Sequence, residues 1–420
     1  MSPTHVTYAN TLRRAVQTEV SILGFRSDIT ETGSTSDVKV LKNTTPISNE
    51  MLADRIGLLP LWYDTITMTE ASWDKEKILF KLHVKNDTDQ VRLVTAADFE
   101  CVERMPEEEG AEPRRIPNTK FFHPDPITTE TPLIIVLKPQ LEGQDPEEVH
   151  LEAYASFGKG REHTRFNPAS VCAYKYTLDD SPDKIKALWL AWLRDQKKVD
   201  MADLEKQPDR KTLLEREFRS LEIYRCFKQD GDGEPNSYDF TVETVGPLQV
   251  QETIYSALLS VAALAEKYGG DLPETVDIRP ADWASPVGFD LWFTNEDHTL
   301  GNLLQTWIAD HSADVYAGYK VPHPLRPEMV LRLGVKEESD ARDLVAEAAM
   351  GIADMFRTWA EQWIQMTVSA GISVPRTPEI GRGATPEVVA GLPWKAHEAA
   401  RGGPVATARP AATARPAAKR

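Results

Sequence analysis

Three consecutive residues of this 420-residue chain combine the side chains that bind metal ions or exchange protons: Glu296, Asp297 and His298. Consecutive side chains diverge from a regular strand or helix, so the three cannot all reach one ion. The alternative interpretation is a helix entry, with Asp297 or Thr299 as the N-cap and the acids near the positive end of the helix. We favour the helix entry over a catalytic group.

Residues 158–161, GKGR, could bind phosphate. They lack the GxxxxGK[ST] spacing and the strand–helix context of a phosphate loop, which favours a tight turn that presents Lys159 and Arg161. His123, His150 and His163 have no metal-ligand spacing. The motifs therefore predict no catalytic residue, no cofactor, no metal and no small-molecule substrate.

The charge favours protein partners over nucleic acid. The chain has 65 acidic and 48 basic residues, a formal net charge of −17, whereas direct binding of a nucleic-acid backbone needs clustered Lys and Arg. Residues 367–420 differ, with eight basic residues against three acidic ones in an Ala/Pro/Arg-rich stretch. This composition predicts a disordered, solvated tail, with weak contact to nucleic acid as the less favoured alternative.

Cysteine usage and hydropathy indicate an intracellular, soluble protein. Cys101, Cys172 and Cys226 lie far apart without CxxC spacing, which argues against a disulfide framework or a structural zinc site. The first residues lack the basic and apolar regions of a signal peptide, and the longest apolar run, 254–265, is about half of what spans a bilayer.

The elements that position these residues fall into four blocks. The first contains a helix whose buried face has Leu12, Ala15, Val16, Val20 and Leu23, and a second helix over 49–56 that Gly57 stops. The second block is β-rich and then charged and helical: it has strands at 78–84, 133–137 and 149–155, a mobile loop at 105–117 and helices within 182–224.

The last two blocks complete two matched halves, each with an early amphipathic helix, strands and a late amphipathic helix. A strand at 238–242 precedes an amphipathic helix with apolar positions from Ile254 to Tyr268, and a break at 269–273 resembles a linker. Residues 274–366 predict strand–helix–strand–helix, with strands at 289–293 and 329–335. The final helix has an apolar stripe that needs a partner helix. Two such halves can pair around a pseudo-twofold axis.

Five motifs resemble the third-largest-subunit type of the alpha-like assembly subunits of cellular RNA polymerases. They are YANTLRR (8–14), NEMLADRIGLLPL (49–61), GKGREHTRFNP (158–168), AYKY (173–176) and FTVETVG (240–246). Two later motifs resemble the eleventh-subunit type: NEDHTLGNLL (295–304) and AGYKVPHPL (317–325). The order of the motifs resembles a fusion of the two subunit types, which is associated with large DNA viruses.

This resemblance implies an α+β fold in which two alpha-like dimerisation modules form an intramolecular pseudo-dimer, with a β-rich domain inserted in the first. The implied boundaries are 1–62 with 231–268, the insert 63–230, the linker 269–273, the second module 274–366 and the tail 367–420. Relatives have a strand before the first helix, so here that strand is absent or translation starts upstream. The zinc-binding cysteines of some relatives are also missing.

The resemblance further implies a non-catalytic subunit that docks the two largest polymerase subunits and small accessory subunits, and meets DNA only through the complex. Planar Arg forks suit contacts with another subunit. The expected partner-binding residues are Arg13, Arg14, Arg55, Gly57, Leu58, Pro60, Lys159 and Arg161. Those expected between the two modules are Leu12, Val16, Ile254, Leu258, Val261, Leu300, Gly301, Leu304, Trp307, Ile352, Phe356 and Trp359. Gly301 is expected to let another backbone approach closely.

Two other functions stay open. One is a stand-alone interaction scaffold of the same fold. The other is an independent enzyme, such as a metal hydrolase that uses Asp297 and His298. A viral fusion would be located in the virion and in the cytoplasm or nucleus of the host cell.

Overall fold

The structure is a computed structural model that describes residues 1–27, 37–65, 68–104, 113–246, 248–281, 288–312 and 314–372. The chain divides into two units, 1–382 and 383–420, and all elements below belong to the first. In the described residues, no helix is both long enough and apolar enough to cross a membrane. The predicted tail from 373 onward lies outside the described residues.

The first helix is shorter than its sequence pattern predicts. Helix α1 (Val6–Thr18) buries Leu12, Ala15 and Val16 as expected, and ends where the N–H of Glu19 bonds to the carbonyl of Ala15. The prediction that Val20 and Leu23 continue this helix is wrong. Both are buried, but Leu23 lies in strand β1 (Ser21–Gly24), which pairs with β9 (Ser156–Lys159).

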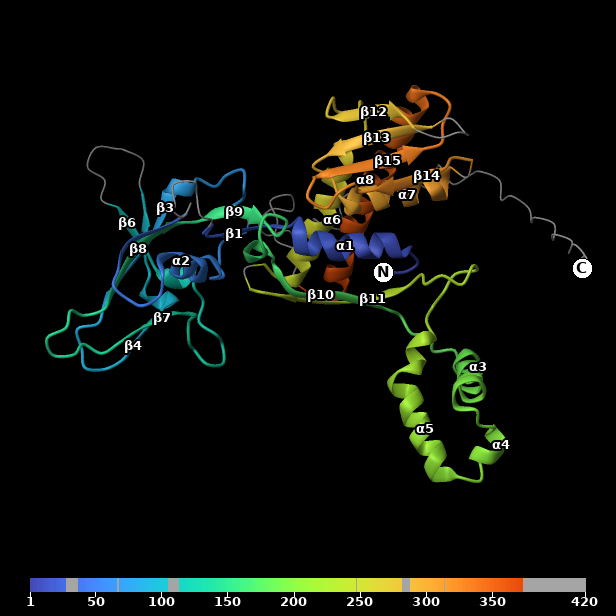
Figure 1. The fold of residues 1–420 in the computed structure, drawn as a ribbon, viewed down its shortest axis with the longest axis horizontal. Helices are drawn as coiled ribbons and strands as arrows, with labels where there is room; N and C mark the ends of the chain where they lie inside the picture. The colour runs from blue at the N-terminus through green and yellow to red at the C-terminus, as the bar shows by residue number, and fades with distance from the viewer. Residues whose placement is uncertain are drawn as a thin grey trace, which may run out of the picture. The chain divides into compact units, whose positions relative to one another are not determined.

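An antiparallel five-stranded sheet forms most of the β-rich segment (Figure 1). Its order is β2 (Val38–Asn43), β8 (Glu148–Tyr154), β3 (Ile78–Lys85), β5 (Glu100–Glu103) and β6 (Arg114–Ile116). The prediction that residues 105–117 form a mobile loop is wrong at 114–116, because these three residues form β6 and pair with β5. Residues 105–112 lie outside the described residues.

A helix and a ribbon complete this segment. Helix α2 (Asn49–Gly57) starts at its N-cap Ser48, and strands β4 (Arg92–Thr95) and β7 (Leu133–Leu137) form a two-stranded sheet. Leu52, Ile56 and Leu61 are fully buried in the same core as the sheet strands. Residues before the predicted boundary at 62 therefore pack with the β-rich segment.

The charged segment folds as a helical subdomain, as predicted. It consists of α3 (Pro182–Trp192), a π-helical turn (Leu193–Lys197), α4 (Met201–Leu204) and α5 (Pro208–Ser220). Trp192, Leu214 and Phe218 belong to a small core of its own. The chain enters this subdomain through β10 (Ala169–Tyr176) and leaves it through β11 (Tyr238–Thr244), which are antiparallel neighbours.

Helix α6 (Val250–Glu266) ends the first half of the chain, and the second half is a four-stranded sheet with two helices. The elements of the second half are β12 (Val276–Pro280), β13 (Phe289–Thr294), α7 (His298–His311), β14 (Ala317–Lys320), β15 (Glu328–Leu333) and α8 (Glu338–Ser369). The strand order is β12-β13-β15-β14. The sequence pattern did not predict β12 and β14, because both are edge strands that contain Pro280 or Gly318, which are unfavourable in strands.

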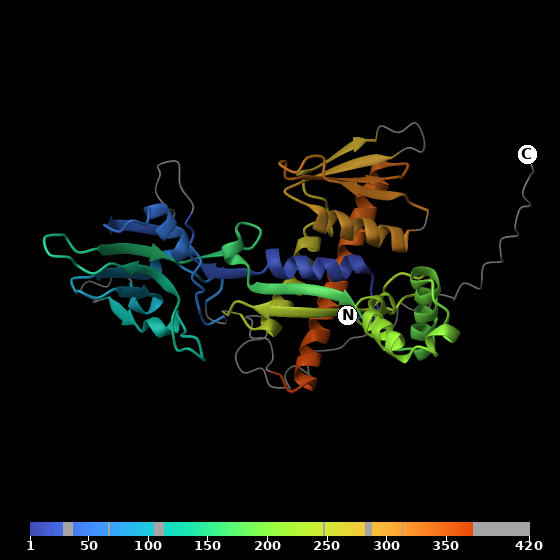
Figure 2. The same cartoon turned by 60° about the horizontal axis from the view of Figure 1, so that its bottom comes forward.

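Four helices pack together where the halves meet (Figure 2). Helix α6 packs on α8 and on α1, and α7 packs on α1 and on α8. The prediction of an apolar stripe on α8 is confirmed, since Val345, Ile352 and Phe356 are fully buried. The helix runs three residues past the predicted boundary at 366, because Thr367 is buried and its hydroxyl donates to the carbonyl of Ile364.

Replacing Phe356 tests the helix core. The ring is fully buried and packs edge-on against Trp359, so Phe356→Ala is expected to lower the free energy of unfolding by about 3–5 kcal/mol in urea titration. Leu213→Ala, at an exposed leucine of α5, is the control and should change it by less than about 0.5 kcal/mol. Equal effects would show that α8 is not a core element.

Candidate functional site

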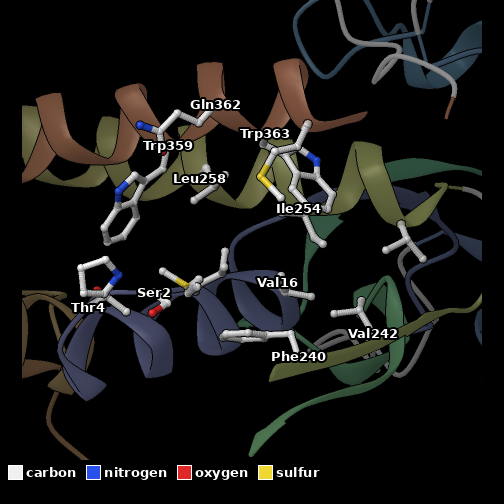
Figure 3. Close-up of a pocket in the computed structure, with 15 residues that line it drawn as sticks. Ser2, Thr4, Val16, Phe240, Val242, Ile254, Leu258, Trp359, Gln362 and Trp363 are labelled. Atoms are coloured by element: carbon white, nitrogen blue, oxygen red, sulfur yellow. The ribbon is translucent and has the colours of Figure 1, made fainter. Parts of the chain in front are cut away.

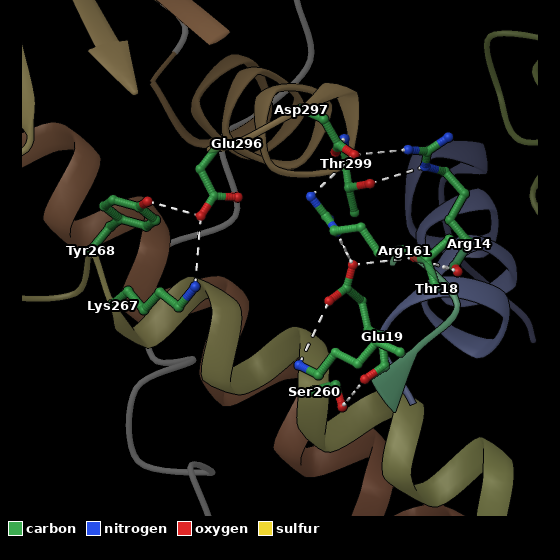
Figure 4. A network of polar contacts seen from close by, with 11 residues as sticks. Arg14, Thr18, Glu19, Arg161, Ser260, Lys267, Tyr268, Glu296, Asp297 and Thr299 are labelled. Atoms are coloured by element: carbon green, nitrogen blue, oxygen red, sulfur yellow. Dashed lines mark hydrogen bonds and ion pairs between the residues drawn. The ribbon is translucent and has the colours of Figure 1, made fainter. Parts of the chain in front are cut away.

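Charged side chains from three parts of the chain meet at the N-terminus of α7 (Figure 4). Asp297 is the N-cap, as predicted, and accepts a 2.7 Å bond from the N–H of Thr299. Arg14 of α1 reaches the same place: its Nε donates to the Thr299 hydroxyl at 2.9 Å and its Nη2 lies 3.3 Å from Asp297. Arg14, predicted to bind another subunit, thus has a partner within the chain.

Arg161 links this point to the end of α1. Its guanidinium donates to Glu19 at 2.6 and 2.9 Å and lies 3.5 Å from Asp297, while Lys159 lies 4.0 Å from Glu19. We call Arg14, Glu19, Arg161 and Asp297 the Asp297 cluster. The turn that presents Arg161 needs Gly160, since a Cβ there would lie 1.9 Å from the carbonyl oxygen of Gln17.

The two carboxyls at this helix start differ in pKa. Burial opposes ionisation of Asp297, but the Thr299 N–H, Arg161 and Arg14 outweigh it and lower its pKa below the usual value. Burial raises the pKa of Glu296, against the opposing effects of the Tyr268 hydroxyl, which donates to it at 2.9 Å, and of Lys267. Glu296 and Asp297 thus point to different partners, as the divergence of consecutive side chains predicts.

Polar and aromatic contacts also join the four helices. The hydroxyls of Thr7 on α1 and Thr306 on α7 lie 3.0 Å apart in a buried contact, and Trp363 on α8 donates to the carbonyl of Gln251 on α6. Tyr8 packs edge-on against Trp359. The residues expected between the modules lie on these four helices, and all are buried or half-buried.

The expected role of Gly301 needs correction. The atoms nearest to a Cβ there would be those of the Tyr319 ring, the first at 2.4 Å, and not those of a backbone. The close approach is therefore an aromatic ring of β14 packed on α7. A second glycine, Gly351 of α8, leaves space in the same way for the ring of Trp307.

A cavity of about 570 Å³ lies between α1, α6, α8 and β11 (Figure 3). Its walls are mostly apolar and include five residues expected between the modules. These are Leu12, Val16, Ile254, Leu258 and Trp359. The first four residues of the chain also line it, and Met1 exchanges two backbone hydrogen bonds with Tyr238 of β11.

A second group of predicted partner-binding residues lies on and after α2. Arg55 and Leu58 are exposed, whereas Gly57 is buried and Pro60 half-buried. Arg55 donates to the carbonyl of Leu133 at the start of β7. The remaining predicted residue, Arg13, is half-buried and bonds to Asn10 and Gln17 of its own helix.

The buried side chain of Arg165 packs against the end of α2. Its side chain is only 4 % exposed, and its guanidinium donates to the Phe25 carbonyl and the Ser27 hydroxyl and lies 3.7 Å from Asp54. Gly57 leaves room for this group, since a Cβ there would lie 2.4 Å from the Arg165 Nη1 atom and the guanidinium would have to shift. Arg165 stands inside the GKGREHTRFNP motif (158–168), but the motif alone does not indicate that this side chain contacts the end of α2.

Within the described ranges, no group of three or more His, Cys, Asp and Glu residues could hold a metal ion. His298, considered above with Asp297, instead lies 3.3 Å from the hydroxyl of Tyr319. The three cysteines are free and buried.

Comparison with known proteins identifies similar chains. Residues 289–362 match the family described as RNA polymerase Rpb3/Rpb11 dimerisation domain. The chain is 30 % identical over 102 residues to DNA-directed RNA polymerases I and III subunit rpc19 of Dictyostelium discoideum, which covers 24 % of this chain and 88 % of that protein. It is 26 % identical over 292 residues to DNA-directed RNA polymerase subunit Rpo3 of Methanopyrus kandleri, and this match covers 65 % of this chain and 90 % of that protein. It is 34 % identical over 71 residues to DNA-directed RNA polymerase II subunit RPB11 of Schizosaccharomyces pombe, and this match covers 17 % of this chain and 58 % of that protein.

Two substitutions separate charge from capping at Asp297. Asn caps helices as well as Asp does, so Asp297→Asn should lower the free energy of unfolding at pH 7 by less than about 1 kcal/mol, and Asp297→Ala by about 1 kcal/mol more. Because the pKa of Asp297 is depressed, its stabilisation is present above the unfolded value of about 3.9 and is lost as the pH falls below it. Urea titrations across pH 2–7 should show that the free energy of unfolding of the Asn variant falls less at acid pH than that of the unchanged protein.

The matched control is Asp195→Asn, which removes an exposed ion pair with Arg194 on the helical subdomain. If the Asn and Ala variants at 297 lose equal stability, the cluster acts through charge and the N-cap contributes nothing measurable.

Arg165→Lys tests the support beneath α2. Lysine keeps the charge but loses the planar fork, so amide hydrogen exchange over residues 49–61 should accelerate at least ~10-fold while exchange in β3 and β8 is unchanged. Arg104→Lys, at an exposed arginine that bonds to Tyr154, is the control. Uniform acceleration across the β-rich segment would contradict a local role.

Proposed function

We propose, because this chain belongs to the family of DNA-directed RNA polymerase subunits with the Rpb3/Rpb11 dimerisation domain, that it is a non-catalytic assembly subunit carrying both partners of the dimer. Residues up to 268 would supply the third-largest-subunit type and residues 274–369 the eleventh-subunit type. Relatives named Rpo3 and RPB11 both match parts of this chain, and the Rpb3/Rpb11 dimerisation domain matches residues 289–362 within the second of these segments.

The observation that carries the proposal is the pairing of equivalent helices. The early helix of each half, α1 and α7, contact each other, and so do the late helices, α6 and α8. A pseudo-twofold axis between the halves would produce both contacts. The Asp297 cluster would then fix the halves relative to one another, since Arg14 and Arg161 come from the first and Asp297 from the second.

The packing refines the proposed domain boundaries. The β-rich insert would begin after α1, near residue 20, because Leu23 and Phe25 belong to its core. It would end near residue 168, because β10 packs on α1 and pairs with β11. The helical subdomain 182–225 would be an excursion between these two strands, and residues 269–273 the linker.

In the polymerase, this subunit would be a preassembled platform for the two largest subunits and for accessory subunits. Covalent linkage of the halves would give a high effective concentration, so that the dimer needs no free partner. The exposed residues Arg55 and Leu58 would contact a large subunit, and DNA would be met only through the complex. By analogy with single-chain fusions of this kind, the chain would serve a viral transcription machinery in the virion or host cell.

Affinity purification of the tagged full chain from its native setting tests this function. Two very large polymerase subunits should be recovered stoichiometrically by mass spectrometry, and Arg55→Glu should reduce their recovery at least ~10-fold by reversing the charge at the contact. Arg210→Glu, on the exposed side of α5, is the control. Recovery of the chain alone in gentle salt would favour a stand-alone scaffold and overturn the assembly function.

A further inference from the structure

One face of α2 is apolar and directed to solvent. Met51, Arg55 and Leu58 follow each other at intervals of four and three residues, which places them on one side of the helix. Met51 is 60 % and Leu58 66 % exposed, while Leu52, Ala53 and Ile56 are fully buried on the other side. Two large apolar side chains therefore flank an arginine on a surface that the protein core does not need.

The neighbouring ribbon continues this apolar surface. Leu93 of β4 stands directly opposite Val136 of β7, and the two are 60 % and 44 % exposed. Directly opposite residues of an antiparallel pair share one face. The register shifts between Val94 and Thr95, so that β7 turns two consecutive residues, Ile134 and Ile135, to the core. Leu133 therefore shares the exposed face with Val136.

Arg55 bridges the helix and the ribbon. Its Nη2 donates to the Leu133 carbonyl at 3.2 Å, which holds the guanidinium between Leu58 and the start of β7. The described residues provide no carboxylate partner for Arg55, although the chain as a whole has an excess of acids. An arginine among exposed apolar side chains has charge and donors left for a carboxylate from another molecule.

Buried contacts of Arg165 and a shared apolar core support this surface. The buried guanidinium of Arg165 contacts Asp54 and fills the space beside Gly57, directly below the end of α2. Binding to a surface that is already ordered costs less conformational entropy than binding to a mobile one. The helix and the ribbon also share a core through Ile56, Ile134 and Leu137.

We propose that Met51 and Arg55 of α2 and Leu58 at its C-cap, with Leu93, Leu133 and Val136 of the β4–β7 ribbon, form one docking surface for an apolar segment that carries a carboxylate. This rests on the proposed function, in which the segment belongs to another polymerase subunit. It extends the contact from α2 onto the ribbon, where the motifs indicate no partner-binding residue. Apolar contacts would supply the affinity, and the ion pair with Arg55 would fix the register.

Site-specific photo-crosslinking tests the surface in the full chain. Benzoylphenylalanine is placed at position 93 or 136, and in a control at the exposed position 213 of α5. After irradiation in the native setting, the crosslinked peptides are sequenced. Positions 93 and 136 should crosslink to one apolar segment of another protein that contains Asp or Glu, and position 213 should not crosslink to it. Adding Arg55→Glu should reduce the yield at 93 at least ~10-fold, and adding Arg210→Glu should not.

The outcomes separate this inference from the proposed function. Absence of a shared segment, a segment without a carboxylate, or crosslinks to a second copy of this chain would each overturn the docking surface. If the two positions crosslink to one acid-bearing apolar segment but affinity purification recovers no large polymerase subunit, the surface stands and the polymerase function fails. If purification succeeds and positions 93 and 136 do not crosslink, the polymerase function stands and the ribbon is not part of the contact.

Discussion

The mutual burial of the apolar faces of α6 and α8 is the constraint on which the rest of this structure depends. Helix α8 has 32 residues with apolar side chains every three or four positions, and exposing such a face to water is unfavourable. Helix α6 covers it, and α1 and α7 complete the packing. Because α6 closes the first half of the chain and α8 closes the second, this burial joins the two halves.

Charge refines an arrangement that apolar packing already stabilises. The members of the Asp297 cluster are partly exposed, and ion pairs of this kind contribute little free energy. These ion pairs instead favour one relative orientation of the helices, because a carboxylate at the start of α7 faces two guanidinium groups, one from α1 and one from the turn after β9. A shifted pairing of the helices would leave these charges without partners.

Glycine allows the close approaches at both candidate regions, the Asp297 cluster and the end of α2. Gly160 lets the turn carrying Arg161 lie against the end of α1, and Gly57 leaves room for the buried guanidinium of Arg165. In each case, an absent side chain allows an arginine to reach its partners. The motifs that contain these glycines therefore include packing requirements within the chain.

The amino-acid pattern alone predicts the main helices and the strands β3, β7, β8, β11, β13 and β15, because strong apolar periodicity specifies which face of an element is buried. It also gives Asp297 as one of two candidate helix caps and the stripe of α8 as a face that needs a partner. The end of α1 and strands such as β5, β6, β10, β12 and β14 are set by the fold and not by the local pattern. These depend on pairing with distant strands, against weak local preferences. The tertiary structure also decided that Arg14 and Arg161 face Glu19 and Asp297 and that Arg165 supports α2. Partners separated by more than a hundred residues leave no local pattern, and only the folded chain brings their charges within hydrogen-bonding distance.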